Sequence, residues 1–276
     1  MRKLLRANFA RLWKDKCFWA VLLVMAGYGI VGCLFQYREV LNGKDGAYMY
    51  QIIFLNDYIL NSVGFAAFAN LFLGREYSDG TMRNKLVTGA TRTNIYLSNY
   101  VTCVGAGIVM QLAYTLTVSI LGIPMFGWNP DSLKAMALYS CLGLLLICSE
   151  MAVFTLASML CQNKAAVAVL CQIGVVAMLF VSMYVMSKLG LPEKIQQSVA
   201  SGDGSYVLEW VENPYYISGS ARKWYQFIQD ILPVGQGLSI VQYGSAHPLL
   251  LALYSVVIAV VCNVAGILGF QRKDLK

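Results

Sequence analysis

Residues Ala165–Met186 read AAVAVLCQIGVVAMLFVSMYVM and contain no charged side chain. A helix needs about 20 mostly apolar residues to cross the hydrocarbon core of a bilayer, which is about 30 Å thick. A helix also satisfies its own backbone hydrogen bonds, and no water is present in the core to satisfy them otherwise. The stretch therefore predicts a transmembrane helix.

Further stretches of the same kind occur along the chain. The predicted spans are Cys17–Leu34, Gln51–Leu73, Ile95–Leu121, Ala135–Leu160, Ala165–Met186 and Leu249–Gly269. Of the 276 residues, 58% are hydrophobic and 13% are charged, whereas an ordinary soluble domain carries about 25% charged residues. The sequence therefore predicts an all-α integral membrane protein with six transmembrane helices in one domain, residues 1–276.

The basic residues are distributed unevenly between the two sides of these spans. If the N-terminus is cytoplasmic, about two thirds of the 21 Lys and Arg residues fall in cytoplasmic segments. Because cytoplasmic loops carry an excess of Lys and Arg, we expect both termini inside, in the cell membrane. The net charge of +7 then reflects attraction to lipid of the inner leaflet and not binding of nucleic acid.

The first segment, residues 1–16, is predicted to be an interfacial helix and not a cleaved signal peptide, because the apolar run after it is too long. Leu5, Phe9 and Leu12 recur at helical spacing on one face, while Arg2 and Arg6 can reach acidic headgroups. This helix could anchor the orientation of the chain, or it could transmit movement.

The second and third spans are joined by residues 74–94, which are predicted to be cytoplasmic. In this loop Ser78, Asp79 and Gly80 form a turn signal, and Thr81 is suited to cap a short helix that Gly89 ends. We expect a polar helix that lies across the membrane surface.

The fifth and sixth spans are joined by residues 187–248, which are predicted to be extracytoplasmic. A helix is expected between Trp224 and Leu232, where apolar residues follow a helical period, and Pro233 should end it. The glycines after Pro233, which are Gly235, Gly237 and Gly244, suggest a tight re-entrant connection.

Two acidic residues, Asp57 and Glu150, fall within predicted spans. A carboxylate near the bilayer centre costs at least about 2.5 kcal/mol, so it needs a partner, water or a proton. Asp57, Asn61 and Phe68 share one helix face. This face and Glu150 could line a substrate path, or they could form an interhelical hydrogen-bond network with Asp57 near the wet outer interface.

Taken together, these features resemble the permease subunits of ABC-2 type ATP-binding-cassette transporters. In that family an interfacial helix precedes six spans, and the loop after span two carries a glycine, a glutamate, a Ser-x-Gly-Thr-like turn, basic residues and a Gly-x-x-Arg element. The matching residues here are Gly74, Glu76, Ser78, Gly80, Thr81, Arg83, Lys85, Gly89 and Arg92.

The resemblance implies that ATP and Mg²⁺ bind to a separate cytoplasmic ATPase, and this chain has no GxxxxGK[ST] phosphate-binding loop of its own. We expect no cofactor or metal on this chain. Two permeases, identical or paralogous, would pair with two ATPases. The residues expected to dock on the ATPase are Glu76, Tyr77, Ser78, Asp79, Gly80, Thr81, Met82, Arg83, Lys85 and Leu86.

The predicted function is transport, and we expect export of a peptide, a drug or another amphipathic molecule. A sensor or assembly subunit that binds an ATPase without moving cargo is the alternative, because the same loop would serve both. An intramembrane enzyme would need paired aspartates, a metal site or a serine with a base, and the sequence shows no such constellation.

Overall fold

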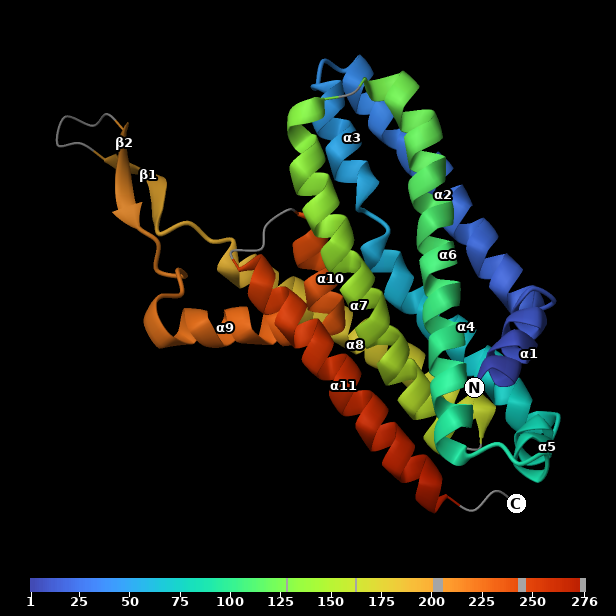
Figure 1. Ribbon diagram of the computed structural model, residues 1–276. Coiled ribbons are helices and arrows are strands. Elements are labelled where there is room, and N and C mark those ends of the chain that lie inside the picture. The colour runs from blue at the N-terminus through green and yellow to red at the C-terminus, as the bar shows by residue number, and fades with distance from the viewer. Residues whose placement is uncertain (128, 162, 201–205, 243–246, 274–276) are drawn as a thin grey trace.

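The computed structural model describes the chain apart from residues 128, 162, 201–205, 243–246 and 274–276 (Figure 1). Within the described residues, 6 candidate membrane spans are present, as predicted. They are α2 (Lys16–Leu41), α3 and α4 together (Gly46–Phe54 and Tyr58–Ser78), α6 (Arg92–Phe126), η1 with α7 (Pro130–Ser132 and Leu133–Leu160), α8 (Lys164–Leu189) and α11 (Pro248–Arg272). The all-α membrane fold is confirmed.

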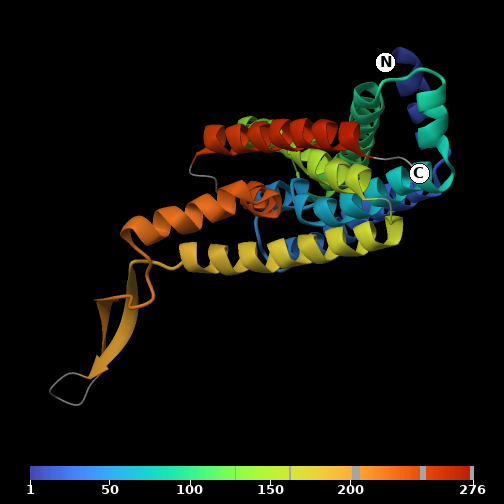
Figure 2. The same ribbon diagram turned by 90° about the horizontal axis from the view of Figure 1, so that it is seen from below.

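The spans differ in how much of their surface the protein itself covers. In the most apolar stretch of the second and of the fourth span 56% of the residues are buried, whereas in the fifth and in the sixth span 17% are. Figure 2 shows α8 and α11 on opposite sides of α4 and α7. Because α8 and α11 expose mostly Leu, Val and Phe side chains, these helices face lipid or another protein chain.

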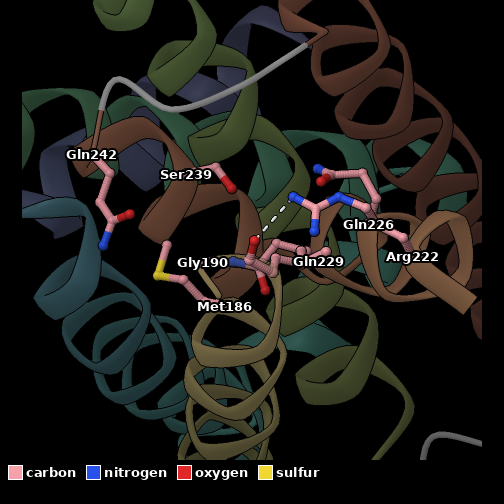
Figure 3. Close-up of a pocket in the computed structure, with 8 residues that line it drawn as sticks. Met186, Gly190, Arg222, Gln226, Gln229, Ser239 and Gln242 are labelled. Carbon is pink, nitrogen blue, oxygen red and sulfur yellow. Dashed lines mark hydrogen bonds between the residues drawn. The ribbon is translucent and has the colours of Figure 1, made fainter. Parts of the chain in front are cut away.

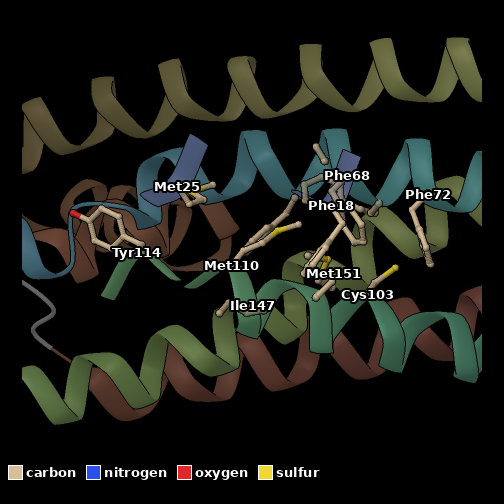
Figure 4. Packing of buried hydrophobic residues seen from close by; sticks show 14 of the residues in the cluster. Phe18, Met25, Phe68, Phe72, Cys103, Met110, Tyr114, Ile147 and Met151 are labelled. Carbon is tan, nitrogen blue, oxygen red and sulfur yellow. The ribbon is translucent and has the colours of Figure 1, made fainter. Parts of the chain in front are cut away.

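The centre of the bundle is filled by aromatic and methionine side chains (Figure 4). Phe68 and Phe72 of α4 stack with ring centroids 5.3 Å apart, and Phe18 of α2 meets Phe68 edge-on at 6.1 Å. Met110 of α6 and Met151 of α7 are fully buried in the same cluster. Unbranched methionines fill irregular gaps between rings, so this cluster holds four of the spans together.

The N-terminal segment forms α1 (Arg2–Leu12), which ends before the predicted boundary at residue 16. The chain turns at Asp15, whose carboxylate accepts from the backbone N–H groups of Cys17 (2.7 Å) and Phe18 (3.1 Å). Such a cap satisfies free N–H groups at the start of α2. Figure 1 shows α1, the end of α11 at Arg272 and α5 (Thr81–Val87) at one end of the bundle, here called the α5 end.

The second span is broken between Phe54 and Tyr58, which the sequence analysis did not predict. The break leaves the carbonyl of Ile53 to accept from the hydroxyl of Tyr114 at 2.5 Å. The side-chain amide of Asn56 donates to Tyr28 Oη at 2.9 Å. Non-helical backbone within a bundle persists where protein groups satisfy it, and both partners come from neighbouring spans.

The segment between the fifth and sixth spans contains more than the predicted short helices. Its first part is an antiparallel hairpin of β1 (Lys194–Ala200) and β2 (Tyr206–Glu212), with Ile195 opposite Val211. Figure 1 shows this hairpin projecting from the end of the bundle remote from α5. The sequence did not lead us to expect this strand pair, which lies before the predicted helix and does not overlap it.

The second part of this segment contains α9 (Gly219–Ile231) and α10 (Pro233–Val241). Pro233 follows the end of α9 as predicted, but it also begins a further helix at the N1 position, which suits proline. Gly235 and Gly237 belong to this buried helix and not to a connection. A Cβ at Gly237 would lie 3.1 Å from the carbonyl oxygen of Tyr58, so glycine allows α10 to approach α4 closely. Gly244 lies outside the described residues.

Candidate functional site

The loop after span two folds into α5 at the predicted place, but its start differs from the prediction. Gly80 is the N-cap, with a φ of 64° that favours glycine. The Thr81 hydroxyl donates to the carbonyl of Glu76 at 3.1 Å and does not cap α5. Gly89 follows the helix with a φ of 86°. The two glycines therefore fix how α5 leaves and rejoins the bundle.

Glu76, at the end of α4, is fully buried and is the centre of an ion cluster. Lys85 of α5 pairs with it at 2.5 Å, and Arg11 of α1 forms a second ion pair. The side-chain amide of Asn99 in α6 donates to the other carboxylate oxygen at 2.9 Å. Lys85 also donates to Asn8 of α1 at 2.9 Å. We call these five residues the Glu76 cluster.

The electrostatics of the Glu76 cluster favour its remaining closed. A buried ion is costly unless it is paired and hydrogen-bonded, and Glu76 has both kinds of partner. Burial lowers the pKa of Lys85, while the nearby Glu76 carboxylate opposes that shift. The guanidinium of Arg11 also lies 3.9 Å from the ring centroid of Phe72. Separating α5 from α4 would leave charges unpaired in the interior.

Further polar contacts connect neighbouring elements at the α5 end. Arg75 of α4 pairs with Asp15 at 2.5 Å, which ties span two to the turn before span one. The hydroxyl of Tyr77 donates to the carbonyl of Met159 in α7 at 2.5 Å. Lys273, just after α11, donates to the same carbonyl at 2.9 Å. These bonds therefore couple the position of α4 at this end to the positions of the first, fourth and sixth spans.

The predicted docking residues differ in how far the structure buries them. Glu76 and Met82 are buried, and Tyr77, Gly80, Thr81, Lys85 and Leu86 are partly buried. Ser78, Asp79 and Arg83 are exposed. In this conformation a partner cannot touch the buried Glu76 or Met82, although both are among the residues predicted to dock.

The outer face of α5 contains one apolar residue that the sequence analysis missed. Val87 is 86% exposed, next to the exposed Arg83 and Asn84 on the same short helix. The available signal in the sequence was an apolar valine within a predicted polar surface helix. Sequence analysis also missed Asn8 and Asn99, because a lone asparagine carries no pattern.

The polar residues within the spans form a second group, along α4. Asn61 donates to Asp57 at 3.2 Å and to Gln111 of α6 at 2.7 Å, and Ser62 donates to Glu150 of α7. Asp57 is fully buried and not at a wet interface.

These contacts bear on the two interpretations of the buried acids. Asp57, Asn61, Phe68 and Glu150 all lie inside the bundle of this one chain. Their contacts correspond to the interhelical network, and a substrate path along them would require the bundle to open. The two acids bond to different side chains, so they do not form the aspartate pair of a protease.

Comparison with protein families places this geometry in a known class. Residues 4–188 match the model of the ABC-2 family transporter proteins, and this match covers α1, the Glu76 cluster, α5 and the first five spans. The chain belongs to this family and is a transmembrane permease of an ABC transporter. Comparison with curated proteins gave no sequence match.

Membership of this family has two direct consequences. The chain is a multi-pass membrane protein and the transport subunit, not itself catalytic. Permeases of the family typically pair with a cytoplasmic ATPase subunit.

Proposed function

We propose that this chain is the permease of an ABC exporter and that its ATPase docks on the outer face of α5. By this proposal α1, α5 and both termini are cytoplasmic, in the cell membrane, and two permeases assemble with two ATPases. ATP and Mg²⁺ bind to the ATPase. The cargo is an amphipathic molecule such as a peptide or a drug, in keeping with an apolar, aromatic bundle that has few charges.

The observation that carries this proposal is the attachment of α5 to three other elements through one carboxylate. Lys85 of α5, Arg11 of α1 and Asn99 of α6 all bond to Glu76 at the end of α4. A force on α5 is therefore applied to α1 and to the second and third spans together. The interfacial helix α1 acts in this transmission and not only as an anchor.

The surface proposed to contact the ATPase consists of the side chains that α5 exposes. Arg83 can pair with an acidic group of the ATPase, and Val87 can enter an apolar hollow, as amphipathic helices do in grooves. The predicted roles of Glu76 and Lys85 change accordingly: they hold α5 from the inside, and Arg83 and Val87 make the contact.

Co-purification with the candidate ATPase encoded by a neighbouring reading frame tests the docking. Arg83→Ala and Val87→Asp should each reduce capture of the ATPase by about tenfold, since each removes one anchor of a small interface. Arg272→Ala is the matched control, because Arg272 is an exposed basic residue outside α5. Capture that is unchanged in both α5 variants, or reduced equally in the control, contradicts docking on α5.

Flux measurements separate the exporter from a sensor or assembly subunit. The permease and its ATPase, reconstituted in vesicles, should move fluorescent amphipathic peptides in an ATP-dependent way. Val87→Asp should abolish both this flux and the stimulation of ATP hydrolysis by the permease. Hydrolysis that depends on the permease, with no flux of any candidate cargo, would favour the sensor.

A further inference from the structure

A cavity of about 270 Å³ lies near the end of α8, remote from the α5 end and outside the Glu76 cluster. Its walls come from the last turn of α8, from one face of α9 and from α10 (Figure 3). Arg222 contributes the charge, and Gln226, Gln229, Ser239 and Gln242 contribute neutral polar groups. We call it the Arg222 cavity.

Arg222 is only partly satisfied by its neighbours. Its Nη2 donates to the carbonyl of Leu189 at 3.0 Å, which caps the end of α8, and its guanidinium lies 5.3 Å from the ring centroid of Tyr216. Its Nη1 is buried without a hydrogen-bond partner. Among the residues that the structure describes, no carboxylate forms an ion pair with Arg222. The cap on α8 therefore uses Nη2 of Arg222 and leaves Nη1 without a partner.

The polar wall of the cavity also contains a hydrogen-bond acceptor without a donor. Gln229 is buried, and its amide nitrogen donates to the carbonyl of Gly235 at 3.1 Å, while its Oε1 has no partner. The acid further along α9, Asp230, accepts from Gln226 at 3.0 Å. Burial raises the pKa of Asp230. A buried donor with no acceptor is unfavourable, so an anionic ligand that accepts from Arg222 Nη1 would stabilise the cavity.

The opposite face of α9 indicates the depth of the cavity in the membrane. Trp224 is 65% exposed and Phe227 is 40% exposed, and with Lys223 they line a separate, mostly apolar hollow. Exposed aromatic residues next to a lysine on an amphipathic helix are typical of the membrane–water interface. The cavity on the other side of α9, at the end of a span, then lies at the level of lipid headgroups.

We propose that the Arg222 cavity binds the phosphate of an anionic phospholipid headgroup, with Nη1 of Arg222 donating to a phosphate oxygen. A planar guanidinium matches phosphate geometry. The Oε1 of Gln229 is free to accept from a headgroup hydroxyl, as in phosphatidylglycerol. At about 270 Å³ the cavity is below the 300–1,000 Å³ usual for drug-sized ligands, so it fits a headgroup and not a transported cargo.

Binding of short-chain phosphatidylglycerol to the purified, delipidated full-length chain tests this proposal. Native mass spectrometry and a thermal-shift titration should both report one bound lipid. Arg222→Gln should weaken binding by about tenfold, because it removes a charge-assisted hydrogen bond. Lys223→Gln is the matched control: it removes the same charge one residue away, on the other side of α9, and binding should be unchanged.

Two further variants cover the case in which Arg222→Gln fails to fold after losing the cap on α8. Arg222→Lys keeps the positive charge but loses the planar guanidinium with its two Nη donors, and it should bind the lipid with intermediate affinity. Gln242→Glu adds a negative charge to the opposite wall and should weaken binding while leaving Arg222 in place. Full binding by both variants would overturn the proposal.

Binding of two further ligands distinguishes a lipid headgroup from free phosphate. Inorganic phosphate and short-chain phosphatidylcholine should bind at least about tenfold more weakly than phosphatidylglycerol, because they lack the headgroup hydroxyls or the net charge. Equal binding of inorganic phosphate would show a free-anion site and overturn the lipid assignment. Equal losses in Arg222→Gln and Lys223→Gln would show a general surface-charge effect and overturn the site altogether.

Discussion

Lys85 and Glu76 lie on opposite sides of a sharp turn, and the ammonium of Lys85 meets the carboxylate of Glu76 at 2.5 Å. This contact closes the segment between α4 and α5 into a small loop, with Gly80 at its bend. Because Glu76 is also bonded to α1 and α6, the closed loop cannot move as an independent flap. A short surface helix thereby becomes part of the bundle.

Loss of the Glu76 charge should destabilise the permease. Glu76→Gln leaves Arg11 and Lys85 without their counterion, and breaking a buried pair costs about 3–5 kcal/mol. Because Arg11 is partly exposed, we expect the loss of stability to lie near the lower end of this range. Thermal unfolding in detergent should show a clear decrease in Tm, whereas the exposed Asp79→Asn should change stability by less than about 0.5 kcal/mol. Equal Tm values for the two variants would mean that the cluster is not closed.

Glycine should be required where α7 crosses α4. A Cβ at Gly143 would overlap the Tyr58 ring, whereas a Cβ at Gly174, on α8, would meet no atom within 4 Å. Gly143→Ala is therefore expected to cost about 1–3 kcal/mol through overpacking. Gly174→Ala should be neutral or stabilising by up to about 1 kcal/mol, because alanine favours a helix. The comparison of the two Tm values checks this, and an equal effect would contradict the packing of α7 on α4.

Asp230 should make stability depend on pH. Burial raises its pKa in the folded state above the usual value of 3.8, so between these two pKa values the folded chain holds a proton that the unfolded chain has already released. This contribution to stability is fully present below pH 3.8 and is lost as the pH rises through the folded pKa.

Asp230→Asn isolates this contribution in a pH series of unfolding curves. The variant keeps the acceptor for Gln226, so it should equal or exceed the wild-type stability at pH 7 and should lack the gain on acidification. Parallel pH profiles for the two proteins would show that Asp230 does not titrate with folding. Asp131→Asn, at an exposed acid in η1, should leave the wild-type profile unchanged.

The proposed orientation predicts which positions an impermeant maleimide reaches from each side. Asn84→Cys in α5 should react only from the cytoplasm, and Gln196→Cys in the hairpin should react only from outside. Both residues are exposed, so access is set by the membrane and not by burial. The parent chain, with its 8 native cysteines, is the blank for each reaction. The reverse pattern would invert the topology.

Parts of the fold that depend on local composition were accessible from the sequence. The span Ala165–Leu189 and the helix α5 lie where hydropathy and the Gly80 and Gly89 signals predicted them. The hairpin was missed because a strand pair of seven residues each gives too short an alternating pattern to be singled out. The break before Tyr58 contains Asn56 and Asp57, but it was missed because the apolar runs on both sides of this polar pair are long enough to be taken as one span. Partners on other spans, such as Tyr114, satisfy polar groups at the break.

The sequence predicted where the candidate site lies along the chain but not which of its side chains point into the bundle. Its loop was identified, yet Glu76 and Met82 point into the bundle and Val87 points out, which no spacing of residues along the loop reveals. The partners Asn8, Arg11 and Asn99 come from segments distant in the chain, and each is an ordinary polar residue in its own context.

The sequence alone determined that this chain crosses the membrane, and roughly where, because the bilayer demands about 20 apolar residues from each helix whatever its neighbours are. Only the tertiary structure decided which polar groups meet at Glu76 and which face of α5 remains open. It also decided that Arg222 faces a cavity with one nitrogen unpaired. Those outcomes depend on how the helices pack, because a buried charge is stable only where side chains from several of them converge.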